Sequence, residues 1–156
     1  MISKEVIFIS DFFINEVMGG AEFCNDALMK LLSPDVKIAS LKSDRVTVQL
    51  VENNLDKFFI VANFFQLAEN VKVALAKTKY VILEHDHKYV RSNNPSLYKD
   101  FLAPEKQIQN KAFYKNALAV LCQSRKHAGV VQRNLLINNI VNLGGNIWNE
   151  EQLATL

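Results

Sequence analysis

The residues best suited to chemistry form one polar cluster, Glu84-His85-Asp86-His87, directly after an apolar segment. A histidine titrates near neutral pH, so it suits general acid–base catalysis or hydrogen bonding to a substrate. If the preceding strand continued, His85 and His87 would point to opposite sides, which argues against one metal ion held by both. A zinc site needs further ligands, and no third ligand is evident nearby. We therefore expect acid–base or binding chemistry here, and no metal.

A second candidate for ligand binding is the pair Gly19-Gly20, at the start of a predicted helix. Glycine lets a ligand approach the backbone closely, and the free N–H groups of a helix start favour a phosphate. The segment has neither the G-x-G-x-x-G pattern nor a Walker loop. An ordinary connection before a helix would also explain two glycines.

A third polar group begins at Ser124 and continues with Arg125-Lys126-His127. Ser124 is a good N-cap for a helix. Cations in the first turn of a helix oppose its dipole, so these side chains could face an anionic ligand together with Lys88 and Arg91. A solvated helix face is the commoner explanation for such a group.

Short apolar runs alternate with helical patterns along the whole chain. The strands are predicted at Val6–Ile9, Val36–Leu41, Phe58–Ala62, Tyr80–Leu83, Ala117–Cys122 and Asn139–Leu143. Helices are expected from Gly19-Gly20 to Ser33-Pro34, from Leu67 to Lys77, from Pro104 to Asn116, and after Ser124. The segment 46–54 favours a helix, although Val46-Thr47-Val48 would also suit a strand. This alternation predicts one α/β domain over residues 1–156, a Rossmann-like parallel sheet with helices on both faces. Ligands bind such sheets beyond the carboxyl ends of the strands, where all three polar groups fall.

The composition excludes several other classes of protein. Hydrophobic residues make up 49% and charged residues 22%, which excludes a disordered chain. The net charge of +2 does not indicate nucleic acid or an acidic membrane as a partner. No apolar run approaches ~18 residues and no secretion signal is visible, so we expect a cytoplasmic protein without a transmembrane segment. Cys24 and Cys122 lie in apolar segments and are expected to be buried thiols.

Four motifs follow one another along the sequence. They are Ile7-Phe8-Ile9-Ser10-Asp11 leading to Gly19-Gly20-Ala21-Glu22, then Val81-Ile82-Leu83-Glu84-His85-Asp86, then Ala119-Val120-Leu121-Cys122-Gln123-Ser124, and last Ile140-Val141-Asn142-Leu143-Gly144-Gly145-Asn146. Together they span almost the whole chain. In this order they resemble the amino-terminal domain of GT-B glycosyltransferases, especially the large family-4 group.

The resemblance implies transfer of a sugar from a nucleotide-diphosphate sugar to an acceptor, with retention favoured and no cofactor besides the donor substrate. It implies that Gly19 and Gly20 approach the donor diphosphate and the transferred sugar. It places His85 beside the reacting sugar as the catalytic residue, with Asp86, His87 and Ser124 contributing to substrate binding. In that family the amino-terminal domain mainly holds the acceptor, while a carboxy-terminal domain holds the nucleotide.

The sequence departs from the family in one respect, because the basic pair and the Glu-rich motif of the nucleotide-binding domain are absent from these 156 residues. Half a site cannot enclose a donor, so we expect little turnover from this chain without a carboxy-terminal domain. Ile147, Trp148, Leu153 and Leu156 follow the last predicted strand and could pair with that domain or with a second copy. Trp148 could equally cap the chain's own core.

Two other functions compete with glycosyl transfer. The main alternative is a non-catalytic Rossmann-like module that binds a ligand or regulates a partner. A hydrolase using His85 and Asp86 is disfavoured, because Ser124 does not lie in the G-x-S-x-G turn that would make it a nucleophile.

Overall fold

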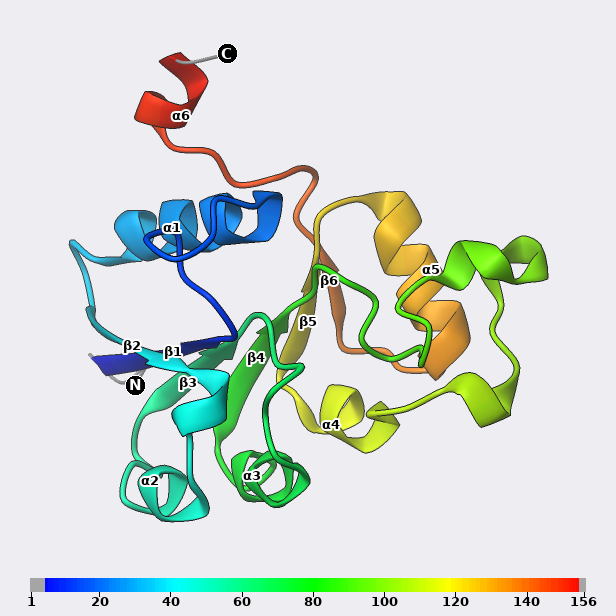
Figure 1. The fold of residues 1–156 in the computed structure, drawn as a ribbon, viewed down its shortest axis with the longest axis horizontal. Coiled ribbons are helices and arrows are strands. Elements are labelled where there is room, and N and C mark those ends of the chain that lie inside the picture. The colour runs from blue at the N-terminus through cyan, green and yellow to red at the C-terminus, as the bar shows by residue number, and fades with distance from the viewer. Residues whose placement is uncertain (1–4, 155–156) are drawn as a thin grey trace.

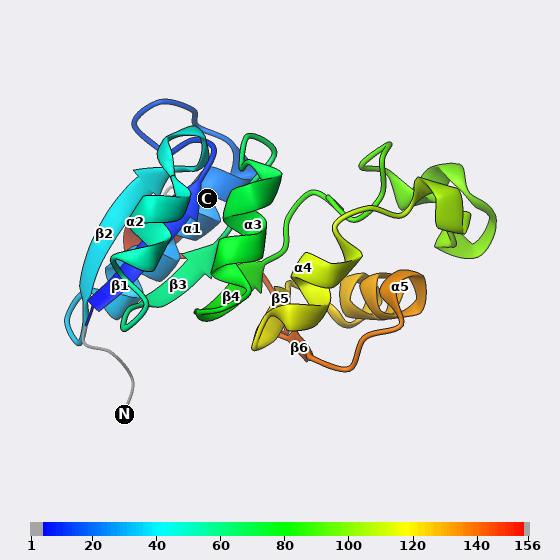
Figure 2. The same ribbon diagram turned by 90° about the horizontal axis from the view of Figure 1, so that it is seen from below.

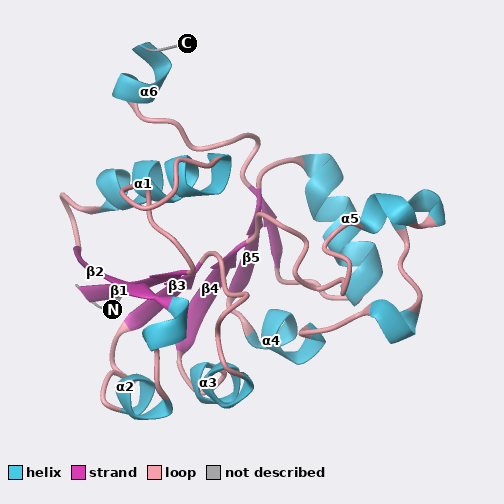
Figure 3. Cartoon of the chain, in the orientation of Figure 1, coloured by secondary structure: helices cyan, strands magenta, loops and turns pink. Residues whose placement is uncertain are grey.

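Six short strands pair in parallel, in the order β2-β1-β3-β4-β5-β6, in the computed structural model, which describes residues 5–154 (Figures 1 and 3). Their bounds are Glu5–Ser10 (β1), Lys37–Lys42 (β2), Phe58–Val61 (β3), Lys79–Leu83 (β4), Ala119–Cys122 (β5) and Ile140–Asn142 (β6). The predicted all-parallel, Rossmann-like sheet is confirmed. Parallel strands need crossover connections, and helices supply most of these.

The helices lie on both faces of the sheet. They are α1 (Gly20–Leu32), α2 (Val48–Glu52), α3 (Glu69–Leu75), α4 (Lys111–Asn116), α5 (Arg125–Leu135) and α6 (Glu150–Ala154). Helix α1 covers one face above β1 and β2, whereas α2, α3 and α4 cover the other (Figures 1 and 2). Four single 3-10 turns complete the chain at Ser43–Arg45, Pro95–Leu97, Lys99–Phe101 and Glu105–Gln107. No described helix is long and apolar enough to cross a membrane.

The helix predicted from Pro104 to Asn116 is wrong over its first half, because α4 begins only at Lys111. Residues 107–109 instead pair with residues 89–91 in a short antiparallel bridge. The N–H of Arg91 donates to Gln107 O over 2.9 Å, and the N–H of Gln109 donates to Tyr89 O over 2.8 Å. This pairing needs extended backbone, so the helix can start only after it.

The hydrophobic core has two parts, one on each face of the sheet. The larger part lies under α2 to α5 and includes Tyr80, whose ring stacks on Phe113 at 4.9 Å. The smaller part lies under α1 and is centred on Phe8. Cys24 and Cys122 are buried free thiols, as predicted, and burial raises the pKa of Cys122 to about 12.

The segment after β6 returns across the molecule to α1, and α6 lies beyond that helix (Figure 1). The side-chain amide of Gln152 donates to Phe23 O over 3.1 Å. Trp148 is 43% exposed and therefore does not cap the core, and Leu153 is more exposed still. Leu156 lies outside the described residues. The expected pairing of this apolar segment with a partner stays a prediction.

The carboxylate of Asp11 ties together the loops that follow β1, β2 and β3. It is almost fully buried and accepts hydrogen bonds from the backbone N–H groups of Phe65, at 2.8 Å, and Gln66, at 3.1 Å. The Ser43 hydroxyl, from the turn after β2, donates to the same carboxylate. The Asp11 side chain thus fixes the carboxyl ends of β1, β2 and β3 relative to one another.

Replacing Asp11 with alanine should destabilise the fold by about 2–4 kcal/mol, because two backbone donors and one hydroxyl lose a charged acceptor. Chemical denaturation would measure the change against Asp56→Ala, which removes an exposed carboxylate from the opposite end of the molecule. Equal losses in the two variants would contradict the role of Asp11.

Candidate functional site at the carboxyl edge of the sheet

His85 lies directly after β4 and is held from both sides of its ring. Its Nε2 lies 3.0 Å from Asn25 Oδ1 of α1, and its Nδ1 lies 2.9 Å from Gln123 Nε2, just after β5. An amide oxygen accepts and an amide nitrogen donates, so Nε2 carries the ring proton. Asn25 in turn donates to Ser10 Oγ over 3.3 Å. His85 therefore connects the ends of β1, β4 and β5 with α1.

The His85 ring is neutral at pH 7. Burial lowers its pKa to about 4, and the nearby charge of Lys88 acts in the same direction. A neutral imidazole with so low a pKa is a weak base, but it remains a good hydrogen-bond donor through Nε2. Since both nitrogens already have protein partners, a substrate would have to replace Asn25 or Gln123.

Gly19 and Gly20 differ in what their missing side chains allow. Gly19 is the N-cap of α1, and a Cβ there would collide with the carboxylate of Glu22. Glu22 is buried and accepts a hydrogen bond of 3.5 Å from Asn63 Nδ2. A Cβ on Gly20 would meet no atom within 4 Å. A side chain at Gly19 would thus force the buried Glu22 carboxylate to shift, whereas the space at Gly20 is open to a ligand.

Glu84 and Lys88 are two buried charged residues that influence each other electrostatically, a relation that the sequence analysis did not predict. Glu84 is fully buried, accepts a hydrogen bond from the Tyr114 hydroxyl, and leaves Oε1 without a partner among the described residues. Burial alone would raise the pKa of Glu84, but Lys88 and Tyr114 hold that pKa below its ordinary value. Asp86, beside them, is half-exposed and lies 3.4 Å from Lys88 Nζ. The sequence feature that could have indicated this buried charge is a glutamate directly after a buried strand.

His87 turns away from His85 towards α5. Its backbone has a φ of 49°, its Nδ1 lies 2.8 Å from the Tyr89 hydroxyl, and its ring centre lies 4.7 Å from that of His127. Within residues 5–154 no group of three side chains could hold a metal ion. Ser124 is the predicted N-cap of α5, and its Oγ accepts from the N–H of His127 at 3.1 Å. The polar edge thus has two sides: His85 faces α1, whereas His87 faces α5.

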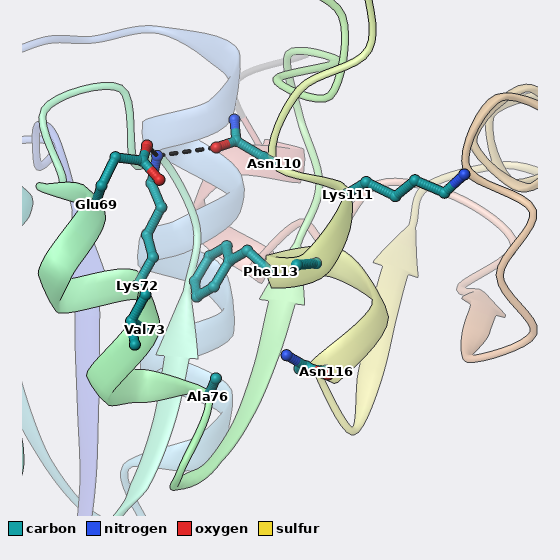
Figure 4. Close-up of a pocket in the computed structure, with 9 residues that line it drawn as sticks. Glu69, Lys72, Val73, Ala76, Asn110, Lys111, Phe113 and Asn116 are labelled. Carbon is teal, nitrogen blue, oxygen red and sulfur yellow. Dashed lines mark hydrogen bonds and ion pairs between the residues drawn. The ribbon is translucent and has the colours of Figure 1, made fainter. Parts of the chain in front are cut away.

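A separate groove of about 330 Å³ runs between α3 and α4 (Figure 4). Lys72 is its buried charge, and its ammonium donates to Glu69 Oε1 at 2.5 Å and to Asn110 Oδ1 at 2.9 Å. Phe113 forms part of the wall. None of the residues singled out in the sequence lines this groove, and the polar head of Lys72 is already satisfied.

A comparison of the sequence with protein-family models finds no family that matches, and a search of curated proteins finds no relative that matches.

The neutral state of His85 makes the stability of the fold depend on pH. The unfolded chain protonates this residue near pH 6.5 and the folded chain only near 4, so the unfolded state binds more protons between these values. Stability should therefore fall as pH drops from about 6.5 to about 4, with His85 contributing up to about 3 kcal/mol of the loss. Denaturation of His85→Gln at several pH values should give a shallower dependence, and an unchanged slope would contradict the assignment.

The two glycines should respond differently to alanine. Gly19→Ala must displace the buried Glu22 carboxylate and should cost about 1–2 kcal/mol. Gly20→Ala meets open space and should leave stability unchanged or raise it by about 0.5–1 kcal/mol, since alanine restricts the unfolded chain. Thermal unfolding of the pair, side by side, would decide this. A destabilised Gly20→Ala would mean that the backbone there needs glycine.

Proposed function

We propose that this chain is the acceptor-side, amino-terminal half of a GT-B glycosyltransferase, which moves a sugar from a nucleotide-diphosphate sugar to an acceptor. The Rossmann-like parallel sheet supports this proposal, since that architecture forms each half of a GT-B enzyme. The order of the four motifs along the chain supports it as well. In the proposal, a nucleotide-binding half completes the site, on the same polypeptide or as a separate chain.

The observation that carries the proposal is the bond between His85 and Asn25. Asn25 lies in the second turn of α1, the helix that begins at Gly20. The glycine that leaves room for a ligand and the histidine that follows β4 are therefore parts of one connected edge. A ligand at the start of α1 would lie near both, as transfer between a donor and an acceptor requires.

The proposed chemistry assigns His85 hydrogen bonding rather than proton abstraction. Its neutral ring would donate Nε2–H to a sugar hydroxyl once that hydroxyl replaces Asn25 Oδ1 as the acceptor. Gly20 would let the donor approach the backbone, where the N–H groups of the first turn of α1 face a developing negative charge. Asp86 and Ser124 would help to bind the acceptor. The scheme uses no metal.

A non-catalytic Rossmann-like module is the second candidate, and one observation favours it. Both ring nitrogens of His85 are already bonded within the protein. In this second candidate His85 has a structural role, connecting the strands, and the edge binds a ligand without catalysing a reaction.

Turnover by His85 variants would separate the two functions. With the nucleotide-binding half supplied, His85→Ala should lower kcat by about 10²–10³-fold, the usual loss when one hydrogen-bond donor to the transition state is removed. His87→Ala should change kcat far less. Gly20→Ala should weaken donor binding without loss of stability, because its Cβ occupies the approach. Small, equal effects in both histidine variants would remove the catalytic role of His85, and absence of turnover in the wild-type assembly would favour the non-catalytic module.

A further inference from the structure

The groove between α3 and α4 is a preformed hollow with apolar walls. Its volume of about 330 Å³ is within the range of small-molecule sites. Phe113 forms one wall, and its ring is fixed by Tyr80, which stacks on it at 4.9 Å, and by Phe64, whose ring centre lies 5.2 Å away. Val73 and Ala76 of α3 lie opposite (Figure 4). An apolar group can therefore enter without rearranging the protein first.

One buried positive charge lies at an end of this groove. Lys72 lines the hollow, and its side chain is only 10% exposed. Its ammonium donates to Glu69 Oε1 over 2.5 Å and to Asn110 Oδ1 over 2.9 Å (Figure 4). The centre of the Phe64 ring lies 5.7 Å from the same nitrogen. Asn110 is held on its other side, because its Nδ2 donates to Lys88 O over 2.9 Å. The ammonium is therefore fixed where an acidic group in the groove would meet it.

Glu69, the counterion of Lys72, is the replaceable member of the pair. Its side chain is 82% exposed, whereas that of Lys72 is buried. Glu69 is already largely hydrated and can swing into water at little cost, but a buried ammonium needs an acidic partner. An ion pair with one exposed side chain also loses conformational entropy and contributes little net stability. An incoming carboxylate can therefore replace Glu69 and leave Lys72 paired.

We propose that this groove binds a small monocarboxylic acid with an apolar body. Its carboxylate accepts from Lys72 in place of Glu69, and its apolar body packs against Phe113 and Val73. Burial of the apolar body drives binding, and the ion pair selects for an acid.

The charge of the groove indicates a single negative charge on the ligand. Lys72 and Lys111 are the cations among the lining residues, and Lys111 is directed away from the hollow (Figure 4). A phosphate dianion would bring a second charge that one ammonium does not balance. In the hollow of about 540 Å³ beside β2, Lys42 and Glu16 pair at 2.8 Å, and both side chains are partly exposed. That hollow therefore lacks the buried charge that would select a ligand.

This site goes beyond the proposed function and does not rest on it. Neither Gly20 nor His85 lines the groove. Glycosyl transfer without binding of the acid would remove this inference alone. Binding of the acid without transfer would remove the proposed function alone.

The test is a titration of the whole chain with hexanoate and, separately, with hexanol, which share an apolar chain and differ in charge. NMR follows the methyl groups of Val73 and Ala112 in the groove, with Ala27 of α1 as the reference. Hexanoate should shift the groove signals saturably and bind about 10-fold or more tightly than hexanol, the effect of a hydrogen bond to a charged group. The Ala27 signal should stay unchanged.

Two variants of the ion pair should respond in opposite directions. Lys72→Met keeps an unbranched side chain and removes the charge, so the preference for hexanoate over hexanol should disappear. Glu69→Gln removes the competing carboxylate and should tighten hexanoate binding by about 2–5-fold, the worth of an exposed pair that no longer has to open. Lys99→Gln removes an exposed lysine from another part of the surface and should change nothing.

Equal affinities of the native chain for hexanoate and hexanol would overturn the proposal, since the groove would then recognise no charge. Weaker hexanoate binding by Glu69→Gln would also overturn it. Equal losses in Lys72→Met and Lys99→Gln would show only general attraction to a cationic surface. If Lys72→Met does not fold, the two probes and Glu69→Gln still decide.

Discussion

One buried carboxylate holds together the edge at which the strands end. Asp11 accepts from two backbone N–H groups after β3 and from Ser43 after β2. Three loops that would otherwise move independently are thus fixed relative to β1. Ser10, directly before Asp11, accepts a hydrogen bond from Asn25, which bonds to His85, so the anchored end of β1 is also the end that contacts the His85 side. In a parallel sheet such an anchor matters, because the functional edge consists only of loops.

A second buried charge organises the other half of the edge. Glu84 and Lys88 are both almost completely removed from water, the charge of Lys88 lowers the pKa of Glu84, and the Tyr114 hydroxyl of α4 donates to the Glu84 carboxylate. Two unsatisfied atoms remain beside it, Glu84 Oε1 and His127 Nε2. Buried polar atoms without partners are rare in folded proteins. The other such atom among the described residues, Asn63 Oδ1, lies on the His85 half, beside Glu22 of α1, although both ring nitrogens of His85 are satisfied.

The sequence predicted the sheet, most helices and the Ser124 cap, because these depend on local apolar spacing and on nearby backbone groups. The start of α4 could not be predicted, since it is set by pairing between residues 89–91 and 107–109. The sequence also could not predict that His85 is neutral and hydrogen-bonded through both ring nitrogens. Its partners Asn25 and Gln123 lie 60 and 38 residues away, and neither carries a charge that marks it. The groove at Lys72 could not be predicted either, because it depends on how α3 and α4 pack beside each other.

The two thiols have a practical consequence for work on this protein. Only a thiolate attacks an alkylating reagent, and burial raises the pKa of both Cys24 and Cys122. At pH 7 a thiol with a pKa of about 12 is ionised in roughly one molecule in 10⁵, and neither sulfur is accessible. Alkylation therefore proceeds only through opened conformations. Cys24 reports on α1, and Cys122 on β5 beside the edge strand β6, so the native chain carries its own probes of two different parts of the fold.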